Sequence, residues 1–481
     1  MLQATSLKPN LYANHIYKIM RPFKAIIALP KKVIFESLKA IEDVIVSAFP
    51  GVAGLLTGAI TAALIARGLG PFGMGQYALI VSVSSFAVGL SDMGIGQTAI
   101  RYASRAASQG DAEGQFAILR WTFRLRMLFV LGLSLIMFVL APTIAGTIWH
   151  DTSLTPILQL SLLIGIFATL AHVPVIYSQS IRRFRMNSII QVAQALISFA
   201  GILLVAFFAL WHVGLVIIVS VIAAAIGALA FITVTPKAAF FKFDRSWRPS
   251  HFKLRGALTP PAIKSGEPSA FDSSSIGSFA RFNFVDQMVS VAATYAPVWV
   301  MGIFLIKSQI GVYSAASYVG FPISMLVTAI GTAFWPRVAA ATTFKGNKDL
   351  LRRAMLLTIV TVIGALFYAV FAPLLMPFVF GAGYTSGILV AQLICLGWCI
   401  YLFTVPFGLV GYNLGVVRIS WLINVVVLII IIAINVWLLP IIGPLAAASA
   451  FVISTTFSAA ANGIFVWNKM RQFDVQAVAP D

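Results

Sequence analysis

Long apolar stretches separated by short polar connections run through most of this 481-residue chain. A helix needs about 20 apolar residues to cross roughly 30 Å of hydrocarbon. Spanning strands would give short segments of alternating hydrophobicity, which the sequence lacks, so we predict helices that satisfy their own backbone groups. Twelve spans are predicted, at residues 44–66, 77–99, 125–143, 155–178, 188–210, 213–235, 278–304, 310–335, 355–378, 386–411, 418–438 and 441–466.

Basic residues mark one side of these spans. All 33 Lys and Arg residues lie in the two termini and in every second connection, except Arg67, Lys307 and Arg281. Basic connections resist translocation, so both termini and these connections are predicted to be cytoplasmic. With 60% hydrophobic and only 10% charged residues, the net charge of +19 indicates membrane orientation and attraction to anionic lipids, not binding of nucleic acid.

The chain divides into two lobes with polar extensions. Residues 1–43 interleave basic and apolar residues, which predicts either an amphipathic helix on the inner leaflet or a disordered extension, and not a cleaved signal peptide. Residues 44–235 form the predicted N-lobe and residues 278–466 the predicted C-lobe. The connection at 236–277 has the composition of a tether, and 467–481 is a predicted cytoplasmic tail.

The two lobes resemble each other in sequence. A shift of 236 positions aligns Gly75 with Gly311, Tyr77 with Tyr313, Arg101 with Arg337 and Gly110 with Gly346. Six spans per lobe is an even number, so the repeats are parallel and related by an axis along the membrane normal. Transporters built this way bind substrate between their halves and rock one against the other. The predicted fold is therefore an all-α integral membrane protein with twelve helices in two six-helix lobes.

Several function classes are disfavoured. The connections leave no room for a catalytic domain, and no nucleotide-binding or metal-binding motif occurs. The first external connection, residues 67–76, carries no carboxylate, unlike membrane enzymes that act on lipid-linked sugars. Cys395 and Cys399 lie four residues apart on one helical face and are interpreted as packing residues. We expect no enzyme, no catalytic residue, no cofactor and no metal.

Polar residues inside the spans are the candidate functional groups, because a charge at bilayer depth is costly and usually faces a cavity. The densest group is in the seventh span: Arg281, Asn283, Asp286 and Gln287. Arg281 either binds an anionic substrate group, forms a structural ion pair or reaches the headgroups. Asp286 is too short to reach them, so we predict a buried role in substrate binding or coupling.

Asp92 in the second span is the other deep carboxylate. It is a candidate coupling group, and the alternative is a structural partner for Arg101 or for a backbone donor. The remaining polar candidates are equally well explained by hydrogen bonds between helices. They are Gln191, Gln194, Asn413, Asn424 and Asn435. His172 is interpreted as a core histidine.

Residues 57–102 resemble the start of the Wzx-type polysaccharide flippases, whose superfamily includes the MATE exporters and the lipid II flippases. The similar segments are ARGLGP at 66–71, GQY at 75–77, DMGIG at 92–96 and RY at 101–102. Family members typically have an acidic residue after the proline, where this chain has Phe72. Topology and the internal repeat extend the resemblance beyond this stretch.

The resemblance implies a V-shaped pair of lobes around a cavity that opens alternately to each face of the bacterial inner membrane. The implied substrate is an oligosaccharide on a polyprenyl pyrophosphate, used for O-antigen, capsule or exopolysaccharide. Implied partners are membrane lipids and a polysaccharide polymerase or export machinery. The main alternative is a cation-coupled MATE-type exporter, and a scaffold in the same machinery is a third.

Overall fold

The computed structural model describes residues 31–92, 95–181, 183–240, 273–340, 344–413 and 417–478. The regular elements within these ranges are helices. The first half of the chain contributes α2 (Lys31–Asp92), α3 (Ile95–Ser108), α4 (Ala112–Thr143), α5 (Thr155–Ser180), α6 (Phe184–Phe207) and α7 (Val213–Val234). The second half contributes α9 (Ser273–Phe304), α10 (Lys307–Ala340), α11 (Phe344–Val370), α12 (Ala372–Leu375), α13 (Ile388–Leu402), α14 (Thr404–Asn413), α15 (Val417–Ile442) and α16 (Pro444–Val478).

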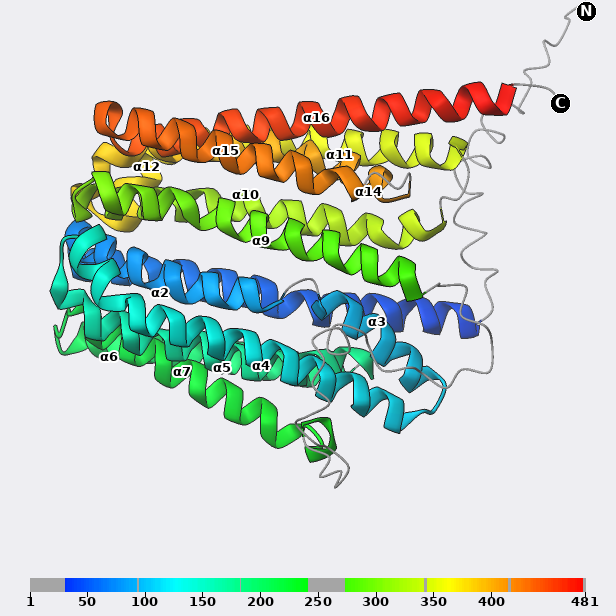
Figure 1. Ribbon diagram of the computed structural model, residues 1–481, viewed down its shortest axis with the longest axis horizontal. Helices are drawn as coiled ribbons and strands as arrows, with labels where there is room; N and C mark the ends of the chain where they lie inside the picture. Colours follow the sequence, from blue (N-terminus) through cyan, green and yellow to red (C-terminus); the bar gives the residue numbers. More distant parts are fainter. Residues whose placement is uncertain are drawn as a thin grey trace, which may run out of the picture.

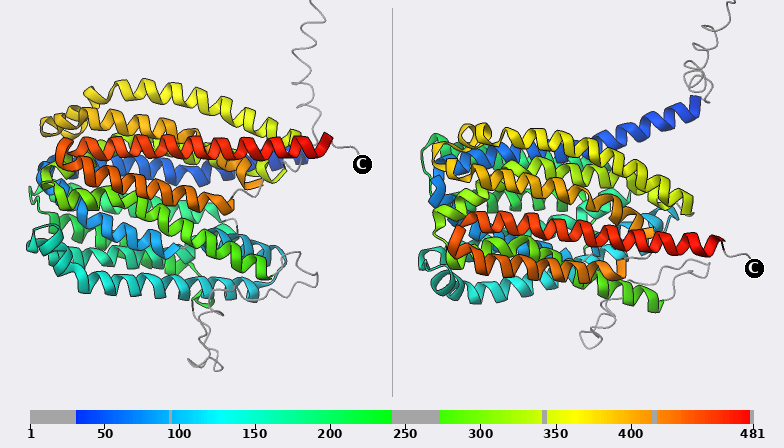
Figure 2. Two further views of the ribbon diagram at one scale, coloured as in Figure 1. Left: turned by 45° about the horizontal axis from the view of Figure 1, so that its top comes forward. Right: turned by 90° about the horizontal axis from the view of Figure 1, so that it is seen from above.

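The long helices lie side by side in one bundle (Figure 1). Helices of the first half, coloured blue to green, occupy one side, and those of the second half, green to red, occupy the other. Both views of Figure 2 keep α16 on the side of the second half, with its C-terminal end at the end of the bundle opposite the α12 region. We refer to α2–α7 as the N-half and to α9–α16 as the C-half.

Within the described residues, eleven stretches of helix are long and apolar enough to cross a membrane, so the chain is a multi-pass membrane protein. Twelve spans were predicted; the first, 44–66, and most of the second, 77–99, lie in the two parts of α2, which has 62 residues and a kink between them. A straight helix of that size would be about 90 Å long, three times the hydrocarbon thickness. The helix is interrupted at Gly70, whose φ of 65° and ψ of 177° are not helical. Glycine has no Cβ to clash in this conformation.

The two arms of α2 meet at one end of the bundle. Arg67 and Gln76, on either side of Gly70, contact residues of other connections: Arg67 reaches the carbonyls at 378 and 379, and Gln76 reaches Asp151. Both arms therefore lead away from the same end, and the chain reverses at a single residue. We call this end, which carries Gly70, Asp151, Lys307 and Gly381, the turn end.

Several helices are longer than the predicted spans at the opposite end. Helix α4 begins at Ala112, capped by Asp111, whose Oδ1 accepts from the Gly114 backbone at 2.8 Å. Arg120, Arg124 and Arg126 were grouped with the charges of a cytoplasmic connection, and the structure places all three within α4. Hydropathy identifies only the apolar part of a helix, whereas charged residues continue it into the interface. For the same reason α16 continues through the predicted tail to residue 478.

Burial separates central helices from peripheral ones. Half of the membrane-spanning window of both α2 and α10 is buried within the protein, against 17% for α4, α6 and α15. The peripheral helices expose large apolar side chains, including Val139, Phe207 and Trp437, which suits lipid contact. Helices α2 and α10 therefore form the centre of the bundle, where the two halves meet.

Candidate functional site

The halves meet at a pair of glycines that the internal repeat had aligned. A Cβ on Gly75 would overlap the Lys307 carbonyl oxygen, and a Cβ on Gly311 would overlap the Pro71 carbonyl oxygen. Position 71 is the repeat equivalent of position 307, so the two contacts are equivalent under an exchange of halves. Only glycine allows backbones to approach this closely. The α2–α10 junction is thus self-complementary, as expected of elements related by a two-fold axis.

The tyrosines of the repeat lie beside this junction. Tyr77 and Tyr313 pack against buried residues of both halves, in the clusters that contain Met74, Leu79 and Val312. Gly75, Tyr77, Gly311 and Tyr313 were predicted as structural positions, and the structure gathers them around one contact. The two glycines let the central helices pack at short range, and the two tyrosines pack beside that contact.

A polar network joins the halves at the turn end. The Asp151 carboxylate accepts from Gln76 at 3.1 Å and from the Ser153 hydroxyl at 2.6 Å, and it lies 3.5 Å from the Lys307 ammonium. Burial disfavours the charged form of Asp151, but these hydrogen bonds and the Lys307 charge outweigh it, so its pKa lies below the ordinary value. Lys307 had stood out as an exception to the charge pattern, and Asp151 explains its place.

Further contacts hold the turn end closed. The Tyr384 hydroxyl donates to the Ala66 carbonyl at 2.7 Å, and the Arg67 guanidinium donates to the carbonyls of Val379 and Phe378. These bonds connect the first arm of α2 to the segment that follows α11. The turn end therefore carries direct hydrogen bonds between the halves in addition to its apolar packing.

Aromatic contacts continue the interface away from the turn end. The Trp299 indole donates to the Ser82 hydroxyl at 2.9 Å, and its ring meets Phe86 edge-on with centroids 4.7 Å apart. Farther along, a Cβ on Gly89 would lie 3.0 Å from the Val291 side chain. Helices α2 and α9 are thus packed together as far as this pair.

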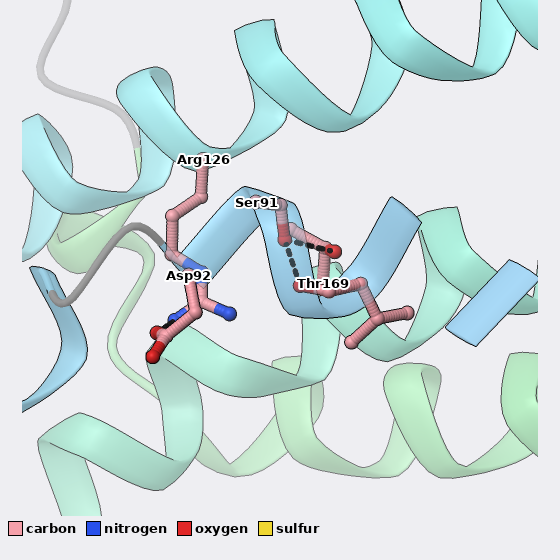
Figure 3. Close-up of polar contacts among 5 residues, drawn as sticks. Ser91, Asp92, Arg126 and Thr169 are labelled. Atoms are coloured by element: carbon pink, nitrogen blue, oxygen red, sulfur yellow. Dashed lines mark hydrogen bonds and ion pairs between the residues drawn. The ribbon is translucent and has the colours of Figure 1, made fainter. Parts of the chain in front are cut away.

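Asp92 lies three residues beyond Gly89, about 4.5 Å along the helix. Its predicted partner was Arg101, but the structure pairs it with Arg126 of α4 (Figure 3). The neighbouring Ser91 hydroxyl lies 3.4 Å from the Thr169 hydroxyl of α5. His172, predicted as a core histidine, is half-buried and interacts electrostatically with both charges. Asp92 therefore has an ion partner in Arg126, as the structural alternative for this carboxylate expected of an arginine, and the side chain of Arg101 lies outside the described residues.

Asp286 lies on α9, five residues before Val291, and is half-buried. Its Oδ1 accepts a hydrogen bond of 2.7 Å from the Asn424 amide of α15, which also lies 3.3 Å from the Ser290 hydroxyl. Gln287 beside it is half-buried as well. Asn424 was a softer candidate in the sequence, and the structure joins it to the seventh-span cluster.

The glutamines of the fifth span have partners within the N-half. The Gln191 amide donates to Asn187, one turn earlier in α6, at 3.2 Å. Gln194 lies against Gly227 of α7. Neither contact involves Asp286, so the structure does not join the two glutamines to the seventh-span cluster.

Some predicted residues have side chains outside the part of the chain that the structure describes. Their backbones belong to α9, α3, α10 and α14. They are Arg281, Asn283, Arg101, Arg337 and Asn413.

Among the described residues, Arg126 is the functional candidate that sequence reasoning missed. It was counted with the cytoplasmic charges, yet it is fully buried. The signal in the sequence was its position: Arg126 directly precedes the apolar run that starts at residue 127. A helix that begins before this run carries Arg126 at the edge of the bilayer. The arrangement provides one buried polar pair in each half: Asp92 with Arg126, and Asp286 with Asn424.

Comparisons with known proteins extend this description. Residues 40–258 match the model of a family described as polysaccharide biosynthesis protein. A eukaryotic MATE transporter aligns with a TM-score of 0.62 at 13% identity, over 91% of this chain and 99% of its own. An inward-facing multidrug resistance MATE transporter aligns with 0.61 at 11%, over 90% and 96%. The lipid II flippase MurJ, in an inward closed conformation, aligns with 0.61 at 14%, over 90% of both chains.

No curated protein sequence matches the chain significantly. At these identities the structural similarities establish the fold, and the family match adds the sequence relationship. The resemblance predicted from the sequence is therefore confirmed: residues 40–258 match the polysaccharide biosynthesis family, and the chain shares its fold with MATE transporters and with the lipid II flippase MurJ.

Proposed function

We propose that this protein is a flippase that moves a polyprenyl-pyrophosphate-linked oligosaccharide from the cytoplasmic to the periplasmic leaflet of a bacterial inner membrane. The observation that carries the proposal is the match of residues 40–258 to polysaccharide biosynthesis proteins. A sugar head would otherwise lose its water while crossing roughly 30 Å of hydrocarbon, and a polar path between two lobes lowers that barrier. No covalent chemistry is required.

The substrate contacts are assigned to the seventh-span cluster. Arg281 neutralises pyrophosphate, and Asn283, Asp286 and Gln287 bind sugar hydroxyls, with Gln191 and Gln194 as further amide groups in the N-half. Support comes from Asp286, which Asn424 holds at 2.7 Å on the helix that packs against α2. A carboxylate fixed in this way can orient a sugar without moving.

Asp92 and Asp286 are proposed as the coupling groups. Each lies one or two turns beyond the contact between Gly89 and Val291, on the side away from the turn end. If the halves rock about the α2–α10 junction, the environment of both carboxylates changes with the motion. The junction supports such a motion because its contacts at Gly75 and Gly311 are equivalent. Either half can therefore rotate against the other about the same point of contact.

Both termini are proposed to be cytoplasmic and the turn end periplasmic. Single cysteines at His150 and Gly381 should then react with an impermeant thiol reagent added to intact cells. Cysteines at Gly110 and Asn347 should react only after the membrane is opened. The native Cys395 and Cys399 are buried and free and would be replaced by alanine first. Reaction of Gly110 from outside would contradict the assigned orientation.

A deletion strain tests the proposed transport. Loss of surface polysaccharide with accumulation of the lipid-linked intermediate is expected. Complementation with Arg281→Ala should fail, and Arg281→Lys should retain part of the activity, because a point charge still attracts phosphate while the bidentate fork is lost. Arg353→Ala, at an exposed position on α11, is the matched control. Protein abundance in the membrane is measured for each variant.

The same strain distinguishes the alternatives. Intact polysaccharide with increased sensitivity to cationic drugs would favour a MATE-type exporter, the class of two of the structural neighbours. Full activity of all the cluster variants would favour a scaffold in the polysaccharide machinery. Co-purification with a polysaccharide polymerase would identify the proposed partner.

A further inference from the structure

Arg126 is buried with most of its hydrogen-bonding capacity unused. The residue is 0% exposed, and among the described residues its partner is the Asp92 carboxylate, which contacts Nη1. Nε and Nη2 are buried and make no hydrogen bond. A guanidinium has five N–H donors and is always charged, so it cannot relieve this cost by losing its proton. The unpartnered atoms are the Nε–Nη2 edge, the fork that receives two oxygens of one anion.

A single ion pair does not account for this arrangement. Unsatisfied buried donors cost free energy, and more so when they carry charge. A structural pair would normally use the fork for both carboxylate oxygens. Here Asp92 occupies one terminal nitrogen and leaves the fork empty (Figure 3).

Gly96 lets the Asp92 carboxylate and the Arg126 guanidinium lie close to the helix backbone. A Cβ at this position would lie 2.8 Å from Asp92 Oδ1 and 3.5 Å from Arg126 Nη1. The Asp92 side chain is 32% exposed and that of Arg126 only 1%, so the approach to the guanidinium is on the side of Asp92. His172 of α5 also lies near both charges.

The pair lies near one boundary of the hydrocarbon core, beyond which the lipid phosphates begin. Asp92 is 16 residues from Gln76, which hydrogen-bonds at the turn end, and this corresponds to about 24 Å along the helix. A hydrocarbon core of roughly 30 Å brings Asp92 close to the opposite face. Phosphate groups of lipids are available at that level.

We propose that the fork of Arg126 binds a phosphate or pyrophosphate group, with Asp92 as the internal anion that neutralises the guanidinium until that group arrives. Arginine suits this role because its planar fork matches two phosphate oxygens. The site is in the N-half and distinct from the seventh-span cluster. The inference rests on the proposed function only in taking a lipid pyrophosphate as one source of the group; a phospholipid headgroup or free pyrophosphate has the same chemistry.

Binding to the purified full-length protein tests the site. In nanodiscs of neutral phosphatidylcholine, inorganic pyrophosphate is titrated by calorimetry. In a second arm, nanodiscs doped with phosphatidylglycerol or polyprenyl pyrophosphate are examined by native mass spectrometry for retained lipid. Arg126→Gln should weaken binding about tenfold or more, and Arg126→Lys should fall between. Asp92→Asn should tighten binding, because the competing carboxylate is removed.

Arg124→Gln, two residues away on the exposed face of α4, is the control for general surface charge and should bind as the wild type does. Where Arg126→Gln alone does not fold, Asp92→Asn/Arg126→Gln removes both charges together and is used in its place. If only the doped lipids are retained, the bound phosphate group belongs to a lipid. If pyrophosphate also binds in the calorimetric experiment, the site accepts free pyrophosphate as well. Either result supports the site.

Three results would overturn the inference. They are wild-type protein that binds in neither arm, an Arg126→Gln or double variant that binds as the wild type does, and an equal loss in Arg124→Gln. A different result would contradict the proposed transport function without contradicting this site. Pyrophosphate binding that depends on Arg126, in a protein whose deletion leaves surface polysaccharide intact, would remove the proposed function and keep the site.

Discussion

The contact between Gly75 and Gly311 predicts an unusual response to the smallest possible substitution. In Gly75→Ala, the new methyl group would overlap the Lys307 carbonyl oxygen and lie 3.1 Å from the Gly311 nitrogen. Carbon and oxygen normally stay beyond about 3.3 Å and the methyl carbon would lie 1.8 Å from this oxygen, so α2 and α10 must separate by about 1.5 Å. Overpacking of this kind costs about 1–3 kcal/mol. Gly311→Ala should cost the same, because its contact with the Pro71 carbonyl is the equivalent one.

The double variant is the sharper test. The separation forced by one methyl group makes room for the other, so the double should cost less than the two singles together, with a coupling of about 0.5–3 kcal/mol. Thermal unfolding in detergent measures all three variants. Gly58→Ala, on the same helix with no atom within 4 Å of its Cβ, is the control and should be neutral or slightly stabilising. Strict additivity, or singles as stable as the control, would refute the close contact.

Three further predictions concern polar contacts. Asn424→Leu should destabilise the protein by about 1–3 kcal/mol, because Asp286 loses its amide donor; Asp286→Leu added to it should recover most of this in thermal unfolding, and a double as unstable as the single would contradict the pairing. Asp151→Asn should lower the melting temperature at neutral pH. Because the folded pKa of Asp151 lies below its ordinary value, its stabilisation is present above that value and is lost as pH falls through the folded pKa, so the variant should lose part of the acid dependence of stability. An unchanged slope would exclude a contribution of the ion pair with Lys307. Arg67→Met should increase amide hydrogen exchange around residues 376–387, where two carbonyls lose their donors, and unaltered exchange would contradict that anchoring.

The sequence by itself determined the membrane class, the apolar segments and the glycine pair of the repeat. Each of these follows from properties of single segments: apolar length sets the spans, and a small residue allows close packing. The pairing of Gly75 with Gly311 by a shift of 236 positions even anticipated which residues meet at the junction. The sequence did not show that the chain reverses at Gly70 alone, since hydropathy does not report how few residues a reversal needs.

Only the tertiary structure decided which polar groups meet. Asp92 pairs with Arg126, and Asp286 with Asn424, 138 residues away. A partner depends on how each helix is rotated about its axis and on which helix packs beside it, and hydropathy fixes neither. Arg126 could not be recognised as buried for the same reason: a charge next to an apolar run is exposed or enclosed according to the helices that surround it.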